Sequence, residues 1–124
     1  MKMRTLFIIN AVVQFFFGLG FLFTPALVLG LFGAQTDGTG IAVAHIAGGV
    51  IFALGIISWL GKDLDAPAQN AIAWGGVLFS HLQAGIFVVI AIMNGTFNAV
   101  AWSAVLQDVF FVAAFFWVRS KKMK

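Results

Sequence analysis

The sequence predicts an all-α fold: residues 1–124 form one membrane domain, an antiparallel bundle of four transmembrane helices. Two observations lead to this prediction. Of the 124 residues, 62% are hydrophobic and only 9% are charged, whereas soluble domains average about 25% charged residues. The apolar residues also fall in four runs, each long enough to cross a hydrocarbon core of about 30 Å. These runs cover residues 5–23, 41–60, 71–93 and 97–118.

The connections between these runs follow from turn-forming residues. Pro25 ends the first run, because proline disfavours helical geometry in the residue before it. Residues 26–32 are too few to span a membrane and predict a short interfacial segment after the first helix. Gly61 ends the second run. Polar and glycine-rich stretches predict the remaining loops and turn, at residues 33–40, 62–70 and 94–96.

The basic residues predict the orientation of the chain. All seven lie at the N-terminus, between the second and third runs, or at the C-terminus. With four spans these segments share one side of the membrane, which the positive-inside rule makes the cytoplasm. We therefore expect a multi-pass protein with cytoplasmic N- and C-termini, and no nucleic-acid partner. The basic residues are Lys2, Arg4, Lys62, Arg119, Lys121, Lys122 and Lys124.

Small residues predict where the helices pack. In lipid, helices associate through close packing and hydrogen bonds, and small side chains let the backbones approach. Several runs carry such residues at helical spacing, so each presents a small face to a neighbour. The predicted packing residues are Gly18, Gly48, Gly55, Gly76, Ser80 and Ala84.

Asp108 is the one carboxylate predicted deep in the membrane, where ionisable groups are costly and usually have a partner or a task. Counting about 1.5 Å per residue places Gln14, His81 and Asp108 at similar depth. A hydrogen bond between His81 and Asp108 is therefore expected. Such a network either fixes the register of the helices or binds a proton or a small polar headgroup. The other candidate members are Asn10, Gln83 and Gln107.

Two histidines raise one cofactor hypothesis. His45 and His81 lie in the second and third runs, and histidine is a common axial ligand of haem. A haem b between the runs would need both imidazoles on opposite faces, although helix-rise counting separates them by about 5–6 Å along the membrane normal. No cofactor is otherwise predicted.

The sequence offers little other chemistry. Cysteine is absent, which removes disulfides and thiolate metal sites. The sequence has no nucleophile elbow, phosphate-binding glycine loop or clustered set of metal ligands. No catalytic residue and no metal site are predicted, and the sequence favours a non-enzymatic protein over an enzyme.

Two stretches carry a resemblance: FTPALVLGLFG after the first run, and AVAHIAGGVIFALGIISWL in the second. They resemble small four-helix bacterial membrane proteins of the broad, largely uncharacterised DoxX-like type. The resemblance implies a four-span fold in the bacterial inner membrane and assigns no catalytic residue.

Three functional hypotheses follow. The first is a non-enzymatic accessory subunit or self-associating bundle, with membrane lipids and either its own copies or a larger membrane complex as partners. The second is a small proton-coupled transporter or channel that uses Asp108 and His81. The third is a haem b electron carrier that uses His45 and His81.

Overall fold

The computed structural model describes the backbone of residues 1–122 and the side chains of residues 1–119. Within these residues the chain is helical and contains no strand, as predicted. Four helical segments are long and apolar enough to cross a membrane: Met3–Phe23, Gly38–Gly61, Ala66–Met93 and Ala99–Arg119. The elements are α1 (Met3–Phe23), α2 (Pro25–Leu31), α3 (Gly38–Gly61), α4 (Ala66–Ile72), η1 (Ala73–Val77), α5 (Leu78–Met93), η2 (Ala99–Ala101) and α6 (Trp102–Lys122).

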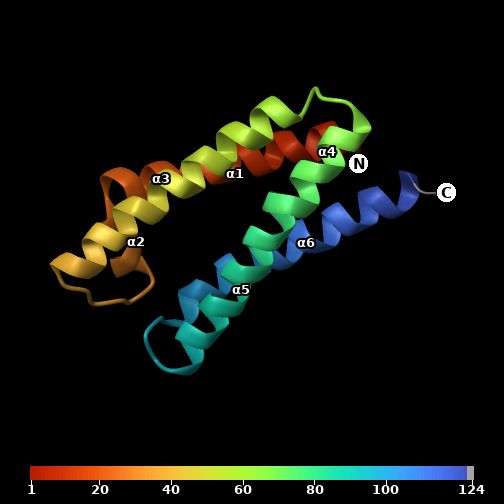
Figure 1. The fold of residues 1–124 in the computed structure, drawn as a ribbon. Helices are drawn as coiled ribbons and strands as arrows, with labels where there is room; N and C mark the ends of the chain where they lie inside the picture. Colours follow the sequence, from red (N-terminus) through yellow and green to blue (C-terminus); the bar gives the residue numbers. More distant parts are fainter. Residues whose placement is uncertain (123–124) are drawn as a thin grey trace.

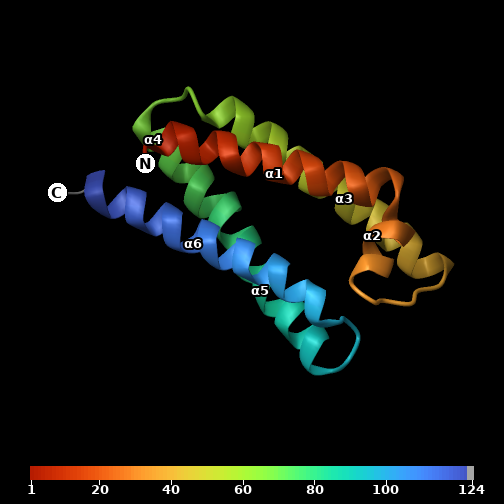
Figure 2. The same ribbon diagram turned by 180° about the vertical axis from the view of Figure 1, so that it is seen from behind.

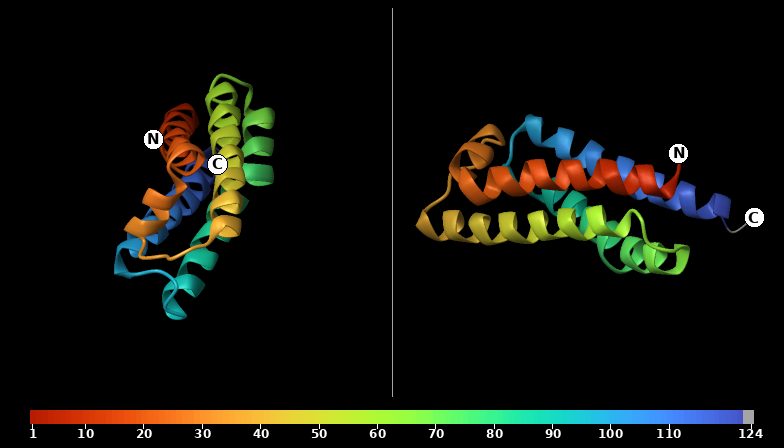
Figure 3. Two further views of the ribbon diagram at one scale, coloured as in Figure 1. Left: turned by 90° about the vertical axis from the view of Figure 1, so that its left-hand side faces the viewer. Right: turned by 90° about the horizontal axis from the view of Figure 1, so that it is seen from above.

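The helices form two antiparallel hairpins, α1 with α3 and α5 with α6 (Figure 1). The hairpins meet at one end and diverge toward the other, which is also clear from behind (Figure 2). The chain's N-terminus, the end of α6 and the α3–α4 connection share the end where the hairpins meet (Figure 3). We call this the terminal end. The opposite end, which holds residues 24–37 and 94–98, is the loop end.

Glycines hold α1 against α3. A Cβ atom added to Gly18 would lie 2.7 Å from the backbone nitrogen of Phe52. One added to Gly48 would overlap the backbone of Leu22, and one added to Gly55 would lie 2.8 Å from the ring of Phe15. The backbones of α1 and α3 therefore pack closely against each other. In lipid, such close packing drives helix association in place of the hydrophobic effect.

A compact apolar core joins the two hairpins at the terminal end. The rings of Phe7 and Phe115 meet edge to face with centroids 5.6 Å apart, and both side chains are almost completely buried. Because the core takes residues from α1, η1, α5 and α6, it seals the terminal end. Its members are Met3, Leu6, Phe7, Ala73, Val77, Leu78, Phe111, Phe115 and Val118.

The third span begins earlier than predicted. Residues 62–70 were expected to form a loop, but α4 begins at Ala66. The physical reason is a helix-start signal: the Asp65 carboxylate accepts a hydrogen bond from the Ala68 backbone nitrogen at 2.9 Å, and Pro67 suits the first helical turn. Buried Gln69 then donates to the carbonyl oxygens of Gly61 and Lys62, so α4 folds back against the end of α3.

A short helix, α2, follows the first span, as predicted for this segment. Gly33 follows it with a φ of +76°, a left-handed conformation that glycine adopts without strain. The predicted basic cluster at the C-terminus is described in part: Lys124 lies outside the described residues, and so do the side chains of Lys121 and Lys122.

Candidate functional site: a buried polar chain at the base of a cavity

A chain of hydrogen bonds joins one side chain from each long helix. Asn10 of α1 donates through Nδ2 to Ser58 Oγ of α3 at 2.8 Å. His81 of α5 lies with Nε2 at 2.6 Å from Asn10 Oδ1 and with Nδ1 at 2.7 Å from Asp108 Oδ1 of α6. All four side chains are buried. We call this set the polar chain, and it connects the two hairpins through buried side chains.

Local packing fixes the two ionisable members. The imidazole of His81 stacks on the ring of Phe111, with centroids 4.5 Å apart and an angle of 17° between the planes. Asp108 approaches α5 at Gly85, where an added Cβ would lie 3.3 Å from the Cβ of Asp108. Glycine at this position therefore makes room for the carboxylate beside His81.

The short His81–Asp108 contact requires one proton between the two groups. If His81 Nε2–H donates to the Asn10 oxygen, the pair holds its proton either on Nδ1 or on the carboxylate, and its net charge is zero in both cases. A side-chain amide also hydrogen-bonds with its two ends exchanged. Turning the Asn10 amide over lets Nδ2 donate to His81 Nε2, while the Ser58 hydroxyl donates to Asn10 Oδ1.

This second direction of the polar chain changes its proton count. His81 then keeps one proton, on Nδ1, and donates it to an ionised Asp108, so the pair carries one negative charge. Each hydrogen bond of the chain is retained in both directions. Gln14 Nε2 lies 3.5 Å from His81 Nε2, and this amide accommodates either direction because its two ends exchange as those of Asn10 do. The same positions of the heavy atoms therefore accommodate two arrangements of the polar chain that differ by one proton.

A cavity of about 500 Å³ lies between the hairpins on the loop side of the polar chain. Gln14, His81 and Asp108 line its deep part, and the core of the terminal end lies beyond them. Its walls are mostly apolar, with four phenylalanines from both hairpins and their connections: Phe17, Phe21, Phe32 and Phe97. The cavity falls within the usual range of small-molecule sites, about 300–1,000 Å³.

Two hydrogen-bond acceptors at the base of the cavity have no partner within the described residues. Asp108 uses Oδ1 for His81, and Oδ2 makes no hydrogen bond. Gln14 contacts His81 through Nε2, which leaves its Oε1 free. Neither oxygen is fully enclosed, since no completely buried side-chain polar atom of the described chain lacks a partner. Both residues line the cavity, and Asp108 Oδ2 lies on the side of Gly85 of α5.

One residue bridges the hairpins at the mouth of this cavity. The backbone nitrogen of Asn98 donates to the carbonyl oxygen of Phe32 at 2.7 Å, and its Nδ2 donates to that of Leu31 at 3.2 Å. The rings of Phe32 and Phe97 lie beside this bridge, with centroids 5.7 Å apart. Both rings line the cavity, so the Asn98 bridge joins the hairpins beside it.

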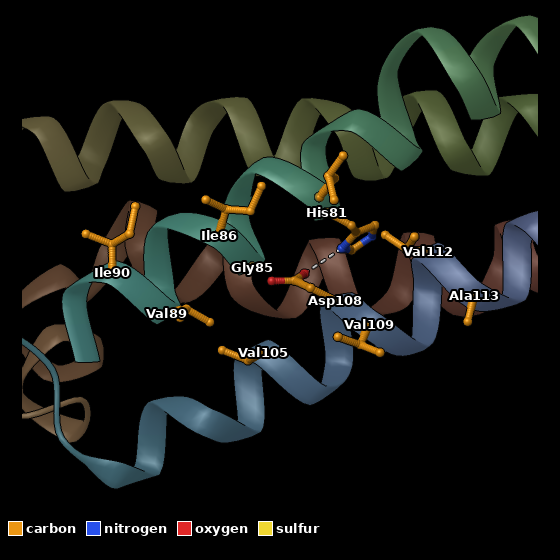
Figure 4. A pocket seen from close by; sticks show the side chains of 11 residues that line it. His81, Gly85, Ile86, Val89, Ile90, Val105, Asp108, Val109, Val112 and Ala113 are labelled. Atoms are coloured by element: carbon orange, nitrogen blue, oxygen red, sulfur yellow. Dashed lines mark hydrogen bonds and ion pairs between the residues drawn. The ribbon is translucent and has the colours of Figure 1, made fainter. Parts of the chain in front are cut away.

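A second hollow of about 460 Å³ lies along the outer side of the second hairpin, between α5 and α6. Figure 4 shows Asp108 directed from α6 toward His81 on α5, with its second oxygen on the side of Gly85. Apart from His81 and Asp108, this groove is lined by apolar residues such as Ile86, Val89 and Val105. The ionisable pair therefore separates the groove from the inter-hairpin cavity.

The remaining predicted network residues occupy different places. Gln107 is half-buried and lines the inter-hairpin cavity. Gln83 is exposed and lines neither hollow, because its position on α5 turns it away from Asp108. We therefore correct the prediction that Gln83 joins the layer.

The packing predictions for η1 and α5 also need correction. Nothing lies within 4 Å of a Cβ added to Gly76, so this glycine makes no close helix contact. Ser80 and Ala84 face the inter-hairpin cavity instead of a packed neighbour, and the Ser80 hydroxyl donates to the Val77 carbonyl oxygen at 2.8 Å. For Ser80 and Ala84 the physical reason is the divergence of the hairpins, which leaves this face of α5 without a partner.

The two histidines have separate surroundings. His45 is exposed, and its Nδ1 lies 2.6 Å from the carbonyl oxygen of Leu22. His81 is buried with both ring nitrogens in the polar chain. A haem between them would have to break these contacts, so the residues as arranged do not fit a bis-histidine haem. The described residues also contain no group of three or more His, Cys, Asp or Glu that could hold a metal ion.

Sequence reasoning missed Ser58 and Asn98. Ser58 lies three residues after Gly55, on the same face of α3, so the glycine stripe contained a signal for it. Asn98 lay in a segment expected to be the start of the fourth span, where only the structure shows its contact with residues 31–32.

No family model, no curated protein and no solved structure matches this chain. The resemblance to DoxX-like proteins therefore stays a prediction.

Proposed function

We propose that this protein is a small proton-coupled carrier, which binds a small molecule between its two hairpins and links that binding to the proton of the His81–Asp108 pair. One observation carries the proposal: the deep end of a 500 Å³ cavity is formed by an ionisable pair with a free carboxylate oxygen. Intramembrane ionisable groups with access to a cavity are typical of ion and proton pathways.

A carrier fits this arrangement better than an open channel. The cavity reaches the polar chain from the loop side, while the core around Phe7, Phe111 and Phe115 fills the terminal side. Asn10 also follows His81 in the polar chain, and a neutral side-chain amide does not accept and pass on a proton as a carboxylate or imidazole does. A proton that enters from the cavity therefore stops at the pair until the conformation changes.

The direction of the cavity in the membrane belongs to the same proposal. The N-terminus, the α3–α4 connection and the end of α6 share the terminal end, and the basic residues of the sequence fall in these segments. The positive-inside rule supports a cytoplasmic terminal end. In a bacterial inner membrane, the cavity would then open toward the periplasm.

Solute-driven proton movement tests the proposal. The protein is reconstituted into liposomes that contain a pH-sensitive dye, and a panel of small neutral, cationic and anionic solutes is applied as gradients. We expect at least one solute to change the internal pH with the wild type and to lose this effect in Asp108→Asn. The matched control is Gln83→Leu, which changes an exposed polar residue of α5 outside both hollows.

A second variant separates loss of the site from loss of the fold. Ala84→Leu fills the cavity from its wall and leaves the residues of the polar chain themselves unchanged, and Ala42→Leu places the same side chain on an exposed position of α3 outside the cavity. Solute-driven flux should fail in the first and persist in the second. A panel without any active solute, or an active solute unaffected by Asp108→Asn and Ala84→Leu, contradicts the carrier.

The partner hypotheses remain predictions. Lipids, further copies of the chain and a larger membrane complex were each expected, and native mass spectrometry from mild detergent would distinguish them. A single stoichiometric complex with another protein, together with no solute-driven flux, would favour the accessory subunit over the carrier.

A further inference from the structure

We propose that the ligand of the inter-hairpin cavity is a monovalent organic cation, an alkyl- or arylammonium ion that replaces the proton shared by His81 and Asp108. This inference rests on the proposed carrier function and narrows its substrate class. The contact it assigns lies between the ammonium group and the free Oδ2 of Asp108, with the hydrocarbon part of the ligand among the phenylalanines of the cavity wall.

The charges around the cavity favour a cation. No Lys or Arg lines it, and Asp108 is the one carboxylate among its lining residues. The groups that face Asp108 and His81 from α1 are the neutral amides of Asn10 and Gln14. From α3 the polar chain receives the Ser58 hydroxyl, so His81 is the sole titratable neighbour of Asp108 within the described chain. An anion would meet a carboxylate and no fixed positive charge.

The hydrogen-bonding groups without a partner in the cavity also favour a cation. The two oxygens without a partner, Asp108 Oδ2 and Gln14 Oε1, are acceptors. A ligand that donates hydrogen bonds or carries positive charge complements both, and the half-buried Gln107 amide of the same cavity adds one further acceptor beside its N–H donors.

The aromatic walls favour an organic cation over a metal ion. Phe17, Phe21, Phe32 and Phe97 line the cavity, and the faces of aromatic rings attract weakly hydrated cations such as alkylammonium groups. A bare sodium or calcium ion requires several oxygen ligands in place of its water shell. The cavity offers a single carboxylate beside neutral amides and hydroxyls, and its volume suits a molecule of several heavy atoms.

The polar chain supplies the exchange between proton and cation. With the proton bound, the His81–Asp108 pair is neutral. When the proton leaves to water, the Asn10 amide turns over, Ser58 donates to it, and the pair carries one negative charge that the incoming cation balances. One proton therefore leaves for each cation bound, and the net charge of the buried site stays at zero. This exchange avoids the cost of burying an unpaired charge.

Calorimetric binding measurements test this exchange. The purified protein in detergent is titrated with benzyltrimethylammonium, with its neutral isostere neopentylbenzene, and with phenylmethanesulfonate as an anion of similar size. Buffers of different ionisation enthalpy report how many protons are released. We expect the cation to bind with release of up to one proton, and its affinity to fall by up to tenfold for each unit that the pH is lowered. The anion should not bind.

Three variants locate the effect. Asp108→Asn should weaken cation binding at least tenfold and abolish proton release, while the neutral isostere still binds. Ala84→Leu should remove binding of both ligands, and Ala42→Leu should change neither. Because Ser58 accepts from Asn10 in one direction of the polar chain and donates to it in the other, Ser58→Ala should change cation affinity and proton release together and leave the neutral isostere unaffected. A merely structural role for Ser58 would alter both ligands alike.

The outcomes separate this inference from the function on which it rests. If neutral or anionic solutes drive proton flux and benzyltrimethylammonium neither binds nor drives it, the cation is wrong and the carrier stands. If no ligand binds and no solute drives flux, both are wrong. Cation binding without proton release, or with no dependence on Asp108, overturns the exchange.

Discussion

The two ends of this molecule differ in how closely their hairpins pack. At the terminal end the hairpins share a dense core in which Phe7 and Phe115 are almost fully buried. At the loop end the same hairpins diverge, and the Asn98 bridge and two facing rings are what connects them. The polar chain lies at the boundary between the two regions. The comparison indicates a molecule that is held rigidly at one end so that the other end can admit a ligand.

The largest expected effect comes from removing an aromatic ring at the closed end. Phe7→Ala removes a side chain with 0% exposure and leaves a hole beside Phe115, which should cost about 3–5 kcal/mol of unfolding free energy. Phe21→Ala, on the cavity wall, should cost much less, because its ring already borders open space. Denaturant unfolding in mixed micelles measures both, and equal losses would show that the two ends are packed alike.

A neighbouring glycine pair tests the close approach within the first hairpin. Gly48→Ala places a Cβ against the backbone of Leu22, and such overpacking should cost about 1–3 kcal/mol. Gly49→Ala is the matched control, since nothing lies within 4 Å of its added Cβ, and it should be neutral or stabilising by up to about 1 kcal/mol. The same unfolding measurement compares them. A Gly48→Ala protein as stable as Gly49→Ala would refute the backbone contact between α1 and α3.

Removing the Asn98 bridge should lower stability less than the preceding substitutions do. It should also measurably increase access to the inter-hairpin cavity. Asn98→Ala removes the side-chain hydrogen bond to Leu31 and the one that Asn98 Oδ1 accepts from Val100 at the start of η2. The bond to Leu31 joins the hairpins and is worth about 0.5–1.5 kcal/mol, so the loop end should open about two- to tenfold more often. A single cysteine at Ala47, on the cavity wall, would then react faster with a polar thiol reagent. Asn94→Ala is the control, because Asn94 bonds within its own turn at Thr96. An equal rate in both variants would mean that the bridge does not limit access.

The smallest effect is expected at the surface of the terminal end. Hydrogen bonds from Lys62, at 2.6 Å, and from Arg4, at 2.8 Å, lower the pKa of Asp63 below its ordinary value of 3.8. The ion pairs therefore stabilise the folded state above pH 3.8, and this contribution is lost as the pH falls through the lowered pKa. Asp63→Asn should be slightly less stable than the wild type at neutral pH and indistinguishable from it in strong acid. A difference that grows toward acid would reverse the assigned sign.

Much of the fold could be predicted from hydropathy because lipid imposes a strict length on each span. The four spans and the α2 segment follow from apolar runs and from Pro25. The early start of α4 was missed because polar residues at 62–70 were read as a loop, although Asp65 and Pro67 are a helix-start signal.

The candidate site could be predicted only in part. Counting helix rise placed His81 and Asp108 at one depth, and their ring nitrogen and carboxylate oxygen lie 2.7 Å apart. Depth does not give the angle of a residue around its helix, which is why Gln83 was wrongly included. The divergence of the hairpins depends on packing between residues far apart in the chain, so the sequence could not reveal the cavity or the contacts of Asn98.

Sided cysteine labelling tests the central claim most directly, and the natural chain contains no cysteine to interfere. Ala47→Cys faces the cavity, Ile46→Cys is its exposed neighbour outside the cavity, and Lys62→Cys marks the terminal end. A membrane-impermeant thiol reagent is applied to intact cells and to inverted membrane vesicles. We predict labelling of position 47 from the loop-end side only, of position 62 from the opposite side, and none at position 46. Labelling of position 47 from the terminal side, or from neither side, would contradict a cavity that opens at the loop end and closes at the polar chain.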